Sequence, residues 1–375
     1  MSAVPTEGEH ARMLSAQTLD FLAARNIAMP AIAILQPADP FLDTAGEALR
    51  RRIFLSEGES GEALCLRPEF TIPVCRHHIA SHANTPARYG YCGTVFRQRR
   101  AEKYKSGNEF TQAGIEDLGD ADEAAADARC MADAITLLAD LKPDFVPTIV
   151  LGDEALFVVL LATLDLAPVW QARLTRLFGD TVKLAETLDS KEFSVKVLPF
   201  DGLDAAAIAT RIEAEMEAAG LTDSGGRTPD DITARLMEKR VLAASGISAK
   251  ARKTLAAFLA LECPLDQAQG VLQQFEAAHG VRLGDALAQF SARIEALNRA
   301  LVDPASITFR AAFGRPLDYY SAMQFEIYGP SPLPLIGGGR YNRLMTLLGA
   351  AKPIPAVGFS MWLDRVEAIG GETVT

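Results

Sequence analysis

The segment RYGYCGTVFRQRRAEKYKSGNEFTQAGIE, residues 88–116, decides the fold that this sequence predicts. Aromatic, β-branched and cysteine residues between 89 and 98 favour a half-buried strand, and Ser-Gly-Asn at 106–108 supplies turn chemistry. A second strand-like stretch returns from 109 to 117. The sequence therefore predicts a long hairpin with a charged tip.

The two arms of this hairpin carry different charges. Arg97, Arg99 and Arg100 end the first strand. Gln112 and Glu116 share one face of the second strand, because side chains in a strand alternate with a period of two. Arginines suit a phosphate or a carboxylate, whereas a glutamine beside a glutamate suits a cationic amine. A solvated, charged hairpin tip explains the same residues equally well.

Composition narrows the class of protein. The chain has 375 residues, 49% hydrophobic and 23% charged, which is typical of a globular protein with two domains or one large domain carrying an insertion. Its net charge of −11 argues against a general nucleic-acid-binding surface. Five cysteines without a CxxC pair predict buried thiols in a reducing compartment. Because there is neither a signal pattern nor a long apolar run, we expect a cytoplasmic protein without a membrane partner.

Histidines are dense only at His77, His78 and His82, where they follow no usual ligand spacing with a cysteine. We interpret them as a cluster on a helix surface. No metal site and no cofactor are therefore expected.

The middle of the chain differs from both ends. Residues 203–300 are rich in Ala, Glu, Leu and Arg, with helical periodicity and no strand signal. Strand patterns resume at 307–310. The sequence therefore predicts an α+β fold in which residues 1–204 and 276–375 form the core and residues 205–275 form an inserted helical subdomain.

Two further motifs follow predicted strands. Glu69 and Thr71 come after the apolar stretch 63–66, a common place for ligand contacts, and they suit an ammonium group. Thr71 would equally serve as a helix cap, with Pro73 in the first turn. Three glycines at 337–339, expected between a strand and a helix, would let the backbone approach a ligand, although a flexible turn has the same composition.

Six motifs together resemble the catalytic core of class II histidyl-tRNA synthetases and occur in that family's order. They are LRPEFT at 66–71, TVFRQRR at 94–100, FTQAGIE at 110–116, GRPLDYY at 314–320, GGGRYN at 337–342 and GFSMWLDR at 358–365. The resemblance implies an antiparallel sheet of six or seven strands flanked by helices. It also implies a homodimer formed through the segment around Leu35, Gln36 and Pro37, and it matches the helical insertion.

The same resemblance implies a histidine-binding pocket. Carboxylates hold an ammonium group, arginine holds a carboxylate, and tyrosine packs against a ring while offering a hydroxyl. The implied residues are Glu69, Thr71, Gln112 and Glu116 around the α-amino group and imidazole, Tyr319, Tyr320 and Tyr341 along the wall, and Arg315 at the carboxylate end.

The nucleotide site departs from the family pattern. Arg99 stands where a synthetase has the glutamate that meets adenine, and Asn108 stands in place of an arginine. Trp362 replaces a small glycine, and its indole would obstruct the adenine. Arg97 and Arg365 remain. We interpret Arg97, Arg99 and Arg365 as remnants of a nucleotide site, and no catalytic residue is expected; Arg365 would otherwise be a helix-surface residue paired with a carboxylate.

The resemblance ends near residue 370, so we expect no anticodon-binding domain and no tRNA partner. This combination resembles the regulatory subunits of ATP phosphoribosyltransferase. That resemblance implies a non-catalytic subunit that joins the short-form catalytic subunit in a hetero-octamer, is required for its activity in the first step of histidine biosynthesis, and confers feedback inhibition by L-histidine. Two alternatives stay open: a truncated synthetase-like enzyme that activates histidine with ATP, and a stand-alone amino-acid sensor that acts on another protein.

Overall fold

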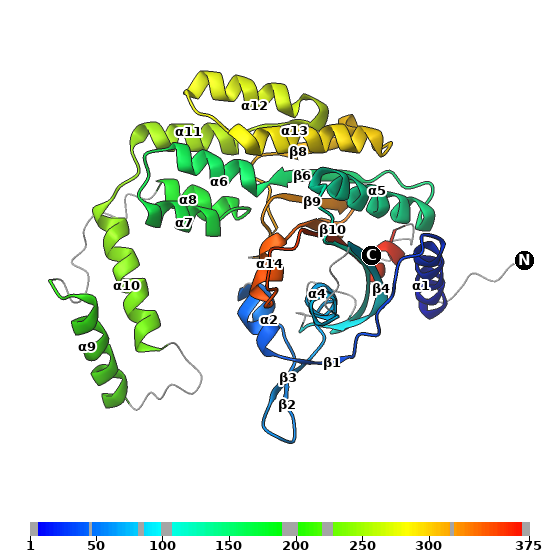
Figure 1. The fold of residues 1–375 in the computed structure, drawn as a ribbon, viewed down its shortest axis with the longest axis horizontal. Coiled ribbons are helices and arrows are strands. Elements are labelled where there is room, and N and C mark those ends of the chain that lie inside the picture. Colours follow the sequence, from blue (N-terminus) through cyan, green and yellow to red (C-terminus); the bar gives the residue numbers. More distant parts are fainter. Residues whose placement is uncertain are drawn as a thin grey trace, which may run out of the picture.

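The computed structural model describes residues 7–44, 47–81, 86–98, 107–189, 202–219, 228–315 and 319–369. In these ranges, one large mixed sheet is flanked by helices, and a three-stranded sheet lies apart from it (Figure 1), in the order β1 (Leu35–Pro37), β3 (Ala63–Leu66) and β2 (Leu55–Glu57). The predicted α+β class is therefore confirmed.

The large sheet has eight strands within the described ranges, in the order β4-β5-β11-β10-β9-β6-β8-β7. The strands are β4 (Ala87–Phe96), β5 (Glu109–Leu118), β6 (Thr148–Asp153), β7 (Glu262–Pro264), β8 (Ile307–Arg310), β9 (Met323–Tyr328), β10 (Pro334–Arg340) and β11 (Ala356–Trp362). Neighbours are antiparallel except β6 and β8. This parallel pair departs from the implied antiparallel sheet because a long helical crossover separates its two strands in the chain.

Helices cover both faces of the sheet. The helices are α1 (Glu7–Ala24), α2 (Asp39–Thr44), α3 (Glu47–Arg50), α4 (Thr71–Ala80), α5 (Glu123–Leu141), α6 (Glu154–Thr163), α7 (Pro168–Arg176), α8 (Thr181–Asp189), α9 (Ala205–Ala218), α10 (Pro229–Ala244), α11 (Ala249–Leu259), α12 (Leu265–His279), α13 (Gly284–Arg299), α14 (Asn342–Leu347) and α15 (Leu363–Glu367). Helices α5, α6 and α13 lie on one side, while α4 lies within the curve of the opposite face (Figure 1). None of the described helices is both long and apolar enough to cross a bilayer.

The hairpin predicted from residues 88–116 is confirmed. Strands β4 and β5 pair over ten residues, from Ala87 opposite Leu118 to Phe96 opposite Glu109. The central residues of the tip, 99–106, lie outside the described ranges. Ala113 and Ile115 enter the large buried cluster, so the alternate residues of β5 face α4, as a period of two requires.

The three-stranded sheet consists of β1 (Leu35–Pro37), β2 (Leu55–Glu57) and β3 (Ala63–Leu66). It presents unusually exposed apolar side chains for such short strands: the exposed fractions are 49% for Leu35 and 61% for Leu55, with Ile34 beside them at 48%.

The helical region contains a strand that its composition did not indicate. Strand β7 has three residues and pairs with β8 at the edge of the large sheet. Nearby, Phe258 of α11 and Phe275 of α12 enter the same buried cluster as Phe157 of α6. Helices α9 and α10 pair with each other and extend away from the sheet (Figure 1). The boundaries 205–275 stay a prediction.

The expected histidine cluster on a helix surface is wrong for His78. This side chain is 1% exposed, and its Nδ1 lies 3.2 Å from the hydroxyl of Tyr89. Burial lowers the pKa of His78, so the ring is neutral near pH 7. His82 lies outside the described residues.

Candidate functional site

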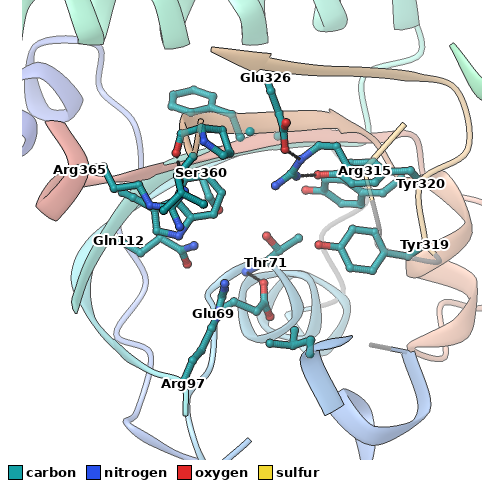
Figure 2. Close-up of a pocket in the computed structure, with 18 of the residues that line it drawn as sticks. Glu69, Thr71, Arg97, Gln112, Arg315, Tyr319, Tyr320, Glu326, Ser360 and Arg365 are labelled. Carbon is teal, nitrogen blue, oxygen red and sulfur yellow. Dashed lines mark hydrogen bonds and ion pairs between the residues drawn. The ribbon is translucent and has the colours of Figure 1, made fainter. Parts of the chain in front are cut away.

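A pocket of about 250 Å³ opens on the face of the sheet that carries α4 (Figure 2). Strands β5, β9, β10 and β11 and the N-terminus of α4 supply its walls. Seven of the eight predicted histidine-binding residues line it: Glu69, Thr71, Gln112, Arg315, Tyr319, Tyr320 and Tyr341. Arg97 and Arg365 line it as well, whereas Arg99 lies outside the described residues.

Glu69 holds the N-terminus of α4. Its carboxylate accepts the backbone N–H groups of Thr71 at 2.6 Å and Ile72 at 2.9 Å. Thr71 is therefore not the cap that its sequence position suggested; it is the first helical residue, and the preceding glutamate satisfies the free N–H groups. Burial raises the pKa of Glu69, while these N–H groups and Arg97 act in the opposite direction. On balance the pKa of Glu69 is raised, and its carboxyl group lies at the pocket wall.

Glu116 lies behind this wall. The hydroxyl of Thr71 donates to Oε1 of Glu116 at 2.7 Å, Tyr91 donates to the same atom at 3.1 Å, and Tyr341 donates to Oε2. Burial is the main cause that raises the pKa of Glu116 to about 8. The sequence placed Glu116 around the ligand, but the structure places it among the groups that orient Thr71 and Tyr341.

Strand β11 leaves room for Glu116 only because residue 358 is a glycine. A β-carbon on Gly358 would lie 1.7 Å from Oε2 of Glu116 and 2.7 Å from the carbonyl oxygen of Ile115. Gly358 and Glu116 are direct cross-strand partners in the pairing of β11 with β5. The register of these two strands therefore determines where the buried carboxyl group lies.

Arg315 forms the opposite side of the pocket with two tyrosines (Figure 2). Its Nε donates to Oε1 of Glu326 at 3.0 Å, and its Nη1 donates to the hydroxyl of Tyr320. The rings of Tyr319 and Tyr320 lie 5.1 Å apart, centroid to centroid. Burial alone would lower the pKa of Arg315, but Tyr320 and Glu326 together raise it. The guanidinium therefore stays charged.

The three glycines at 337–339 are part of β10, so their expected position between a strand and a helix is wrong, and they do not form the alternative flexible turn either. Their function is to let side chains lie flat on the strand. A β-carbon on Gly337 would lie 2.5 Å from Cζ of Arg315, and one on Gly338 would lie 2.8 Å from the ring of Phe325. The close approach is made by the protein's own side chains.

Arg97 and Arg365, the two described arginines that were predicted to be remnants of a nucleotide site, contact different parts of the pocket wall. Nη1 of Arg365 donates to the carbonyl oxygen of Pro334 at 2.5 Å, and the guanidinium lies 4.4 Å from the ring centroid of Trp362. Nε of Arg97 donates to the carbonyl oxygen of Pro68 at 2.6 Å. The Trp362 side chain is buried in the pocket wall. Arg365 thus belongs to the pocket and not to an outer helix surface.

Among the polar atoms of the wall, Oε1 of Gln112 and Nε1 of Trp362 have no hydrogen-bond partner within the described part of the chain, and both residues are at least nine-tenths buried. A buried polar atom without a partner costs roughly 1–3 kcal/mol. A ligand that supplies a donor to Gln112 and an acceptor to Trp362 would recover this free energy.

The sequence did not single out Glu326, which lines the pocket and pairs with Arg315. A signal existed: Gln324 and Glu326 alternate with apolar residues in β9, which places both polar side chains on one face. Arg52 lines the pocket too, and nothing in its surrounding sequence indicates this.

The fold defines a class II synthetase-like protein. The sequence profile of the histidyl-tRNA synthetase family matches residues 3–205 and 232–366. The ATP phosphoribosyltransferase regulatory subunit of Mesorhizobium japonicum is 50% identical over 366 residues, covering 95% of this chain and 97% of its own. That of Brucella ovis is 49% identical over 363 residues, covering 94% and 95%. The chain belongs to the family of ATP phosphoribosyltransferase regulatory subunits, which share the histidyl-tRNA synthetase domain.

Solved structures with this fold have low sequence identity. An ATP phosphoribosyltransferase regulatory subunit/histidyl-tRNA synthetase from Bacillus halodurans superposes with a TM-score of 0.67 at 18% identity, covering 98% of this chain and 80% of that one. A histidine–tRNA ligase subunit from Alicyclobacillus acidocaldarius gives 0.61 at 21% identity, covering 98% and 95%. These structural similarities show that this chain has the class II synthetase fold.

Proposed function

We propose that this chain is a non-catalytic subunit required by a short-form ATP phosphoribosyltransferase catalytic subunit, and that L-histidine in its pocket inhibits the complex. The catalytic partner would make phosphoribosyl-ATP from ATP and phosphoribosyl pyrophosphate, the first step of histidine biosynthesis. The names of the relatives support the partner. The charged and aromatic residues that line the pocket are the evidence for L-histidine as the ligand.

The observation that carries the ligand proposal is the division of charge across the pocket. Glu69 and the unpartnered oxygen of Gln112 suit the α-ammonium group, and Arg315 on the opposite side suits the carboxylate. Tyr319, Tyr320 and Tyr341 supply ring faces and hydroxyls for the imidazole. A volume of about 250 Å³ is at the small end of ligand pockets and fits an amino acid better than a nucleotide.

The decisive experiment mixes this chain with the short catalytic subunit and measures phosphoribosyl-ATP formation with and without histidine. We expect activity only in the mixture and inhibition by histidine, with a coupling of about 1–3 kcal/mol. A catalytic subunit whose activity is indifferent to this chain would overturn the proposal and favour a sensor that acts on another protein.

Calorimetry locates the histidine site. Gln112→Met removes an oxygen that has no hydrogen-bond partner in the described structure, so it should weaken histidine binding with little loss of stability. Gln273→Met, an exposed substitution on α12, is the matched control. Equal histidine affinity in all three proteins would show that the effector binds elsewhere, for instance at a subunit interface.

A second candidate function is histidine activation with ATP. The presence of Arg97 and Arg365 in the pocket wall favours it, because both can hold phosphates. The buried indole of Trp362, beside Arg365, opposes it, since it occupies space that an adenine would need. Pyrophosphate exchange that depends on histidine would establish this activity and refute a purely regulatory role.

The proposed assembly is a hetero-octamer that contains homodimers of this chain. Ile34, Leu35 and Leu55 are each about half exposed or more, which supports a partner surface on the three-stranded sheet. Light scattering of this chain alone tests the homodimer, and light scattering of the mixture tests the octamer.

We further propose a cytoplasmic location without tRNA binding, supported by the free cysteines of the described chain and the net charge of −11.

A further inference from the structure

Arg315 reaches the pocket with part of its hydrogen-bonding capacity already used. Its backbone N–H donates to Oε1 of Gln324 at 2.5 Å, and its side chain donates to Glu326 and to the hydroxyl of Tyr320. The guanidinium lies flat against Gly337, where a β-carbon would come within 2.5 Å of Cζ. Strands β9 and β10 therefore fix the position of this cation.

Glu326 is itself largely shielded from solvent and hydrogen-bonded. The exposed fractions of the Arg315 and Glu326 side chains are 9% and 12%. Oε2 of Glu326 accepts the hydroxyl of Tyr328, the next residue but one in β9, while Oε1 accepts Nε of Arg315. Figure 2 shows Glu326 above Arg315 at the pocket, with Tyr319 and Tyr320 beside it. The protein thus supplies its own carboxylate to the arginine that is expected to meet the ligand.

We propose that Glu326 competes with the ligand's carboxylate for Arg315 and so sets how strongly the pocket prefers an amino acid over an analogue without a carboxylate. This inference rests on the proposed histidine site and deepens it. A ligand carboxylate at the remaining N–H groups of Arg315 would share a guanidinium with Glu326. Two carboxylates on one buried cation repel each other, because the water that would screen them is excluded.

Tyr328 modulates this competition. Its hydroxyl donates to Glu326, which draws negative charge away from the Arg315 side of the carboxylate. Loss of that hydroxyl should strengthen the hold of Glu326 on Arg315. Glu326→Gln and Tyr328→Phe are therefore expected to act in opposite directions on the same ligand contact.

The test compares L-histidine with L-histidinol, in which a hydroxymethyl group replaces the carboxylate, by calorimetry on the full chain. In Glu326→Gln, we expect histidine to bind about fivefold more tightly, the lower end of usual coupling strengths, while histidinol binding barely changes. In Tyr328→Phe, the preference for histidine over histidinol should fall. Glu262→Gln, which alters an exposed pair with Arg310, is the control and should leave both affinities unchanged.

The direction in which histidine affinity changes in Glu326→Gln distinguishes competition for Arg315 from a purely structural role of Glu326. If Glu326 only positions Arg315, Glu326→Gln will weaken histidine binding, and that result overturns the proposal. An unchanged preference in both variants also overturns it, because the ligand's carboxylate then does not meet Arg315. Should Glu326→Gln fail to fold, Tyr328→Phe decides by itself. Failure of the unmodified protein to bind histidine would refute the proposed function, and the inference with it.

Discussion

Glu116 should carry a proton at neutral pH, and Glu116→Gln tests this. Burial raises the pKa of Glu116 to about 8, from an ordinary value of 4.5 that the unfolded chain regains. Between these two values the folded protein keeps a proton that the unfolded chain has released. The folded state is therefore favoured at low pH, and its advantage is lost as the pH rises.

The size of the Glu116 contribution to the free energy of unfolding follows from the difference between its pKa values in the folded and unfolded states. The contribution of Glu116 is fully present below about pH 4.5, falls by about 1.4 kcal/mol per pH unit, and is lost by about pH 8. Its total is on the order of 4–5 kcal/mol as an upper bound. Glutamine has nearly the same shape and no proton to release, so Glu116→Gln should remove this part of the pH dependence.

The assay is urea denaturation, without histidine, at pH 5, 6, 7 and 8. We expect the unmodified protein to lose stability relative to Glu116→Gln as the pH rises, so that the two curves of midpoint against pH diverge. Glu295→Gln, at a side chain that is 73% exposed, is the matched control and should run parallel to the unmodified protein. Parallel curves for Glu116→Gln would refute the reasoning, because they would show that Glu116 is ionised in the folded state.

Three further substitutions test the register of β11 against β5, a buried ion cluster and the N-cap of α5. Gly358→Ala places a β-carbon against the Glu116 carboxyl group and a backbone oxygen, so it should cost about 1–3 kcal/mol in urea unfolding and reduce histidine affinity; unchanged values for both would contradict the described register. Arg293→Met leaves the buried Asp153 without its cation, whereas Asp127 keeps its ion pair with Arg340; the cost should be about 3–5 kcal/mol, and near-native thermal stability would count against that ion cluster. Asp122→Ala removes the N-cap of α5 and should cost about 1 kcal/mol with histidine binding intact, so a loss of binding would argue against a purely local role.

Local pattern was sufficient for the elements that carry the site. Alternation along residues 109–117 predicted a strand, and its period of two correctly placed Gln112 and Glu116 on the face opposite Ala113 and Ile115. The motif resemblance then indicated which distant segments belong together, and seven of the eight expected residues do line one pocket. Whether those residues bind histidine stays a prediction.

Sequence pattern alone gave wrong predictions where the structure of a segment depends on its neighbours in space. Strand β7 has three residues with no strand signal, and it exists because β8 offers an edge to pair with. The glycines at 337–339 have the composition of a turn, but the side chains of Arg315 and Phe325 need their flat strand surface. Such roles depend on neighbours that are remote in the chain.

The sequence by itself determined the class of fold, the hairpin of β4 and β5, and seven of the residues that line the pocket, because alternation and motif order are properties of the chain alone. Only the tertiary structure decided what each charged group does. Glu69 caps α4, Glu116 is buried behind Thr71 and Tyr341, and Glu326 holds Arg315. The reason is physical: burial and hydrogen-bond partners set the charge and direction of a carboxyl group, and both arise only when β5, β9, β10 and β11 come together around α4.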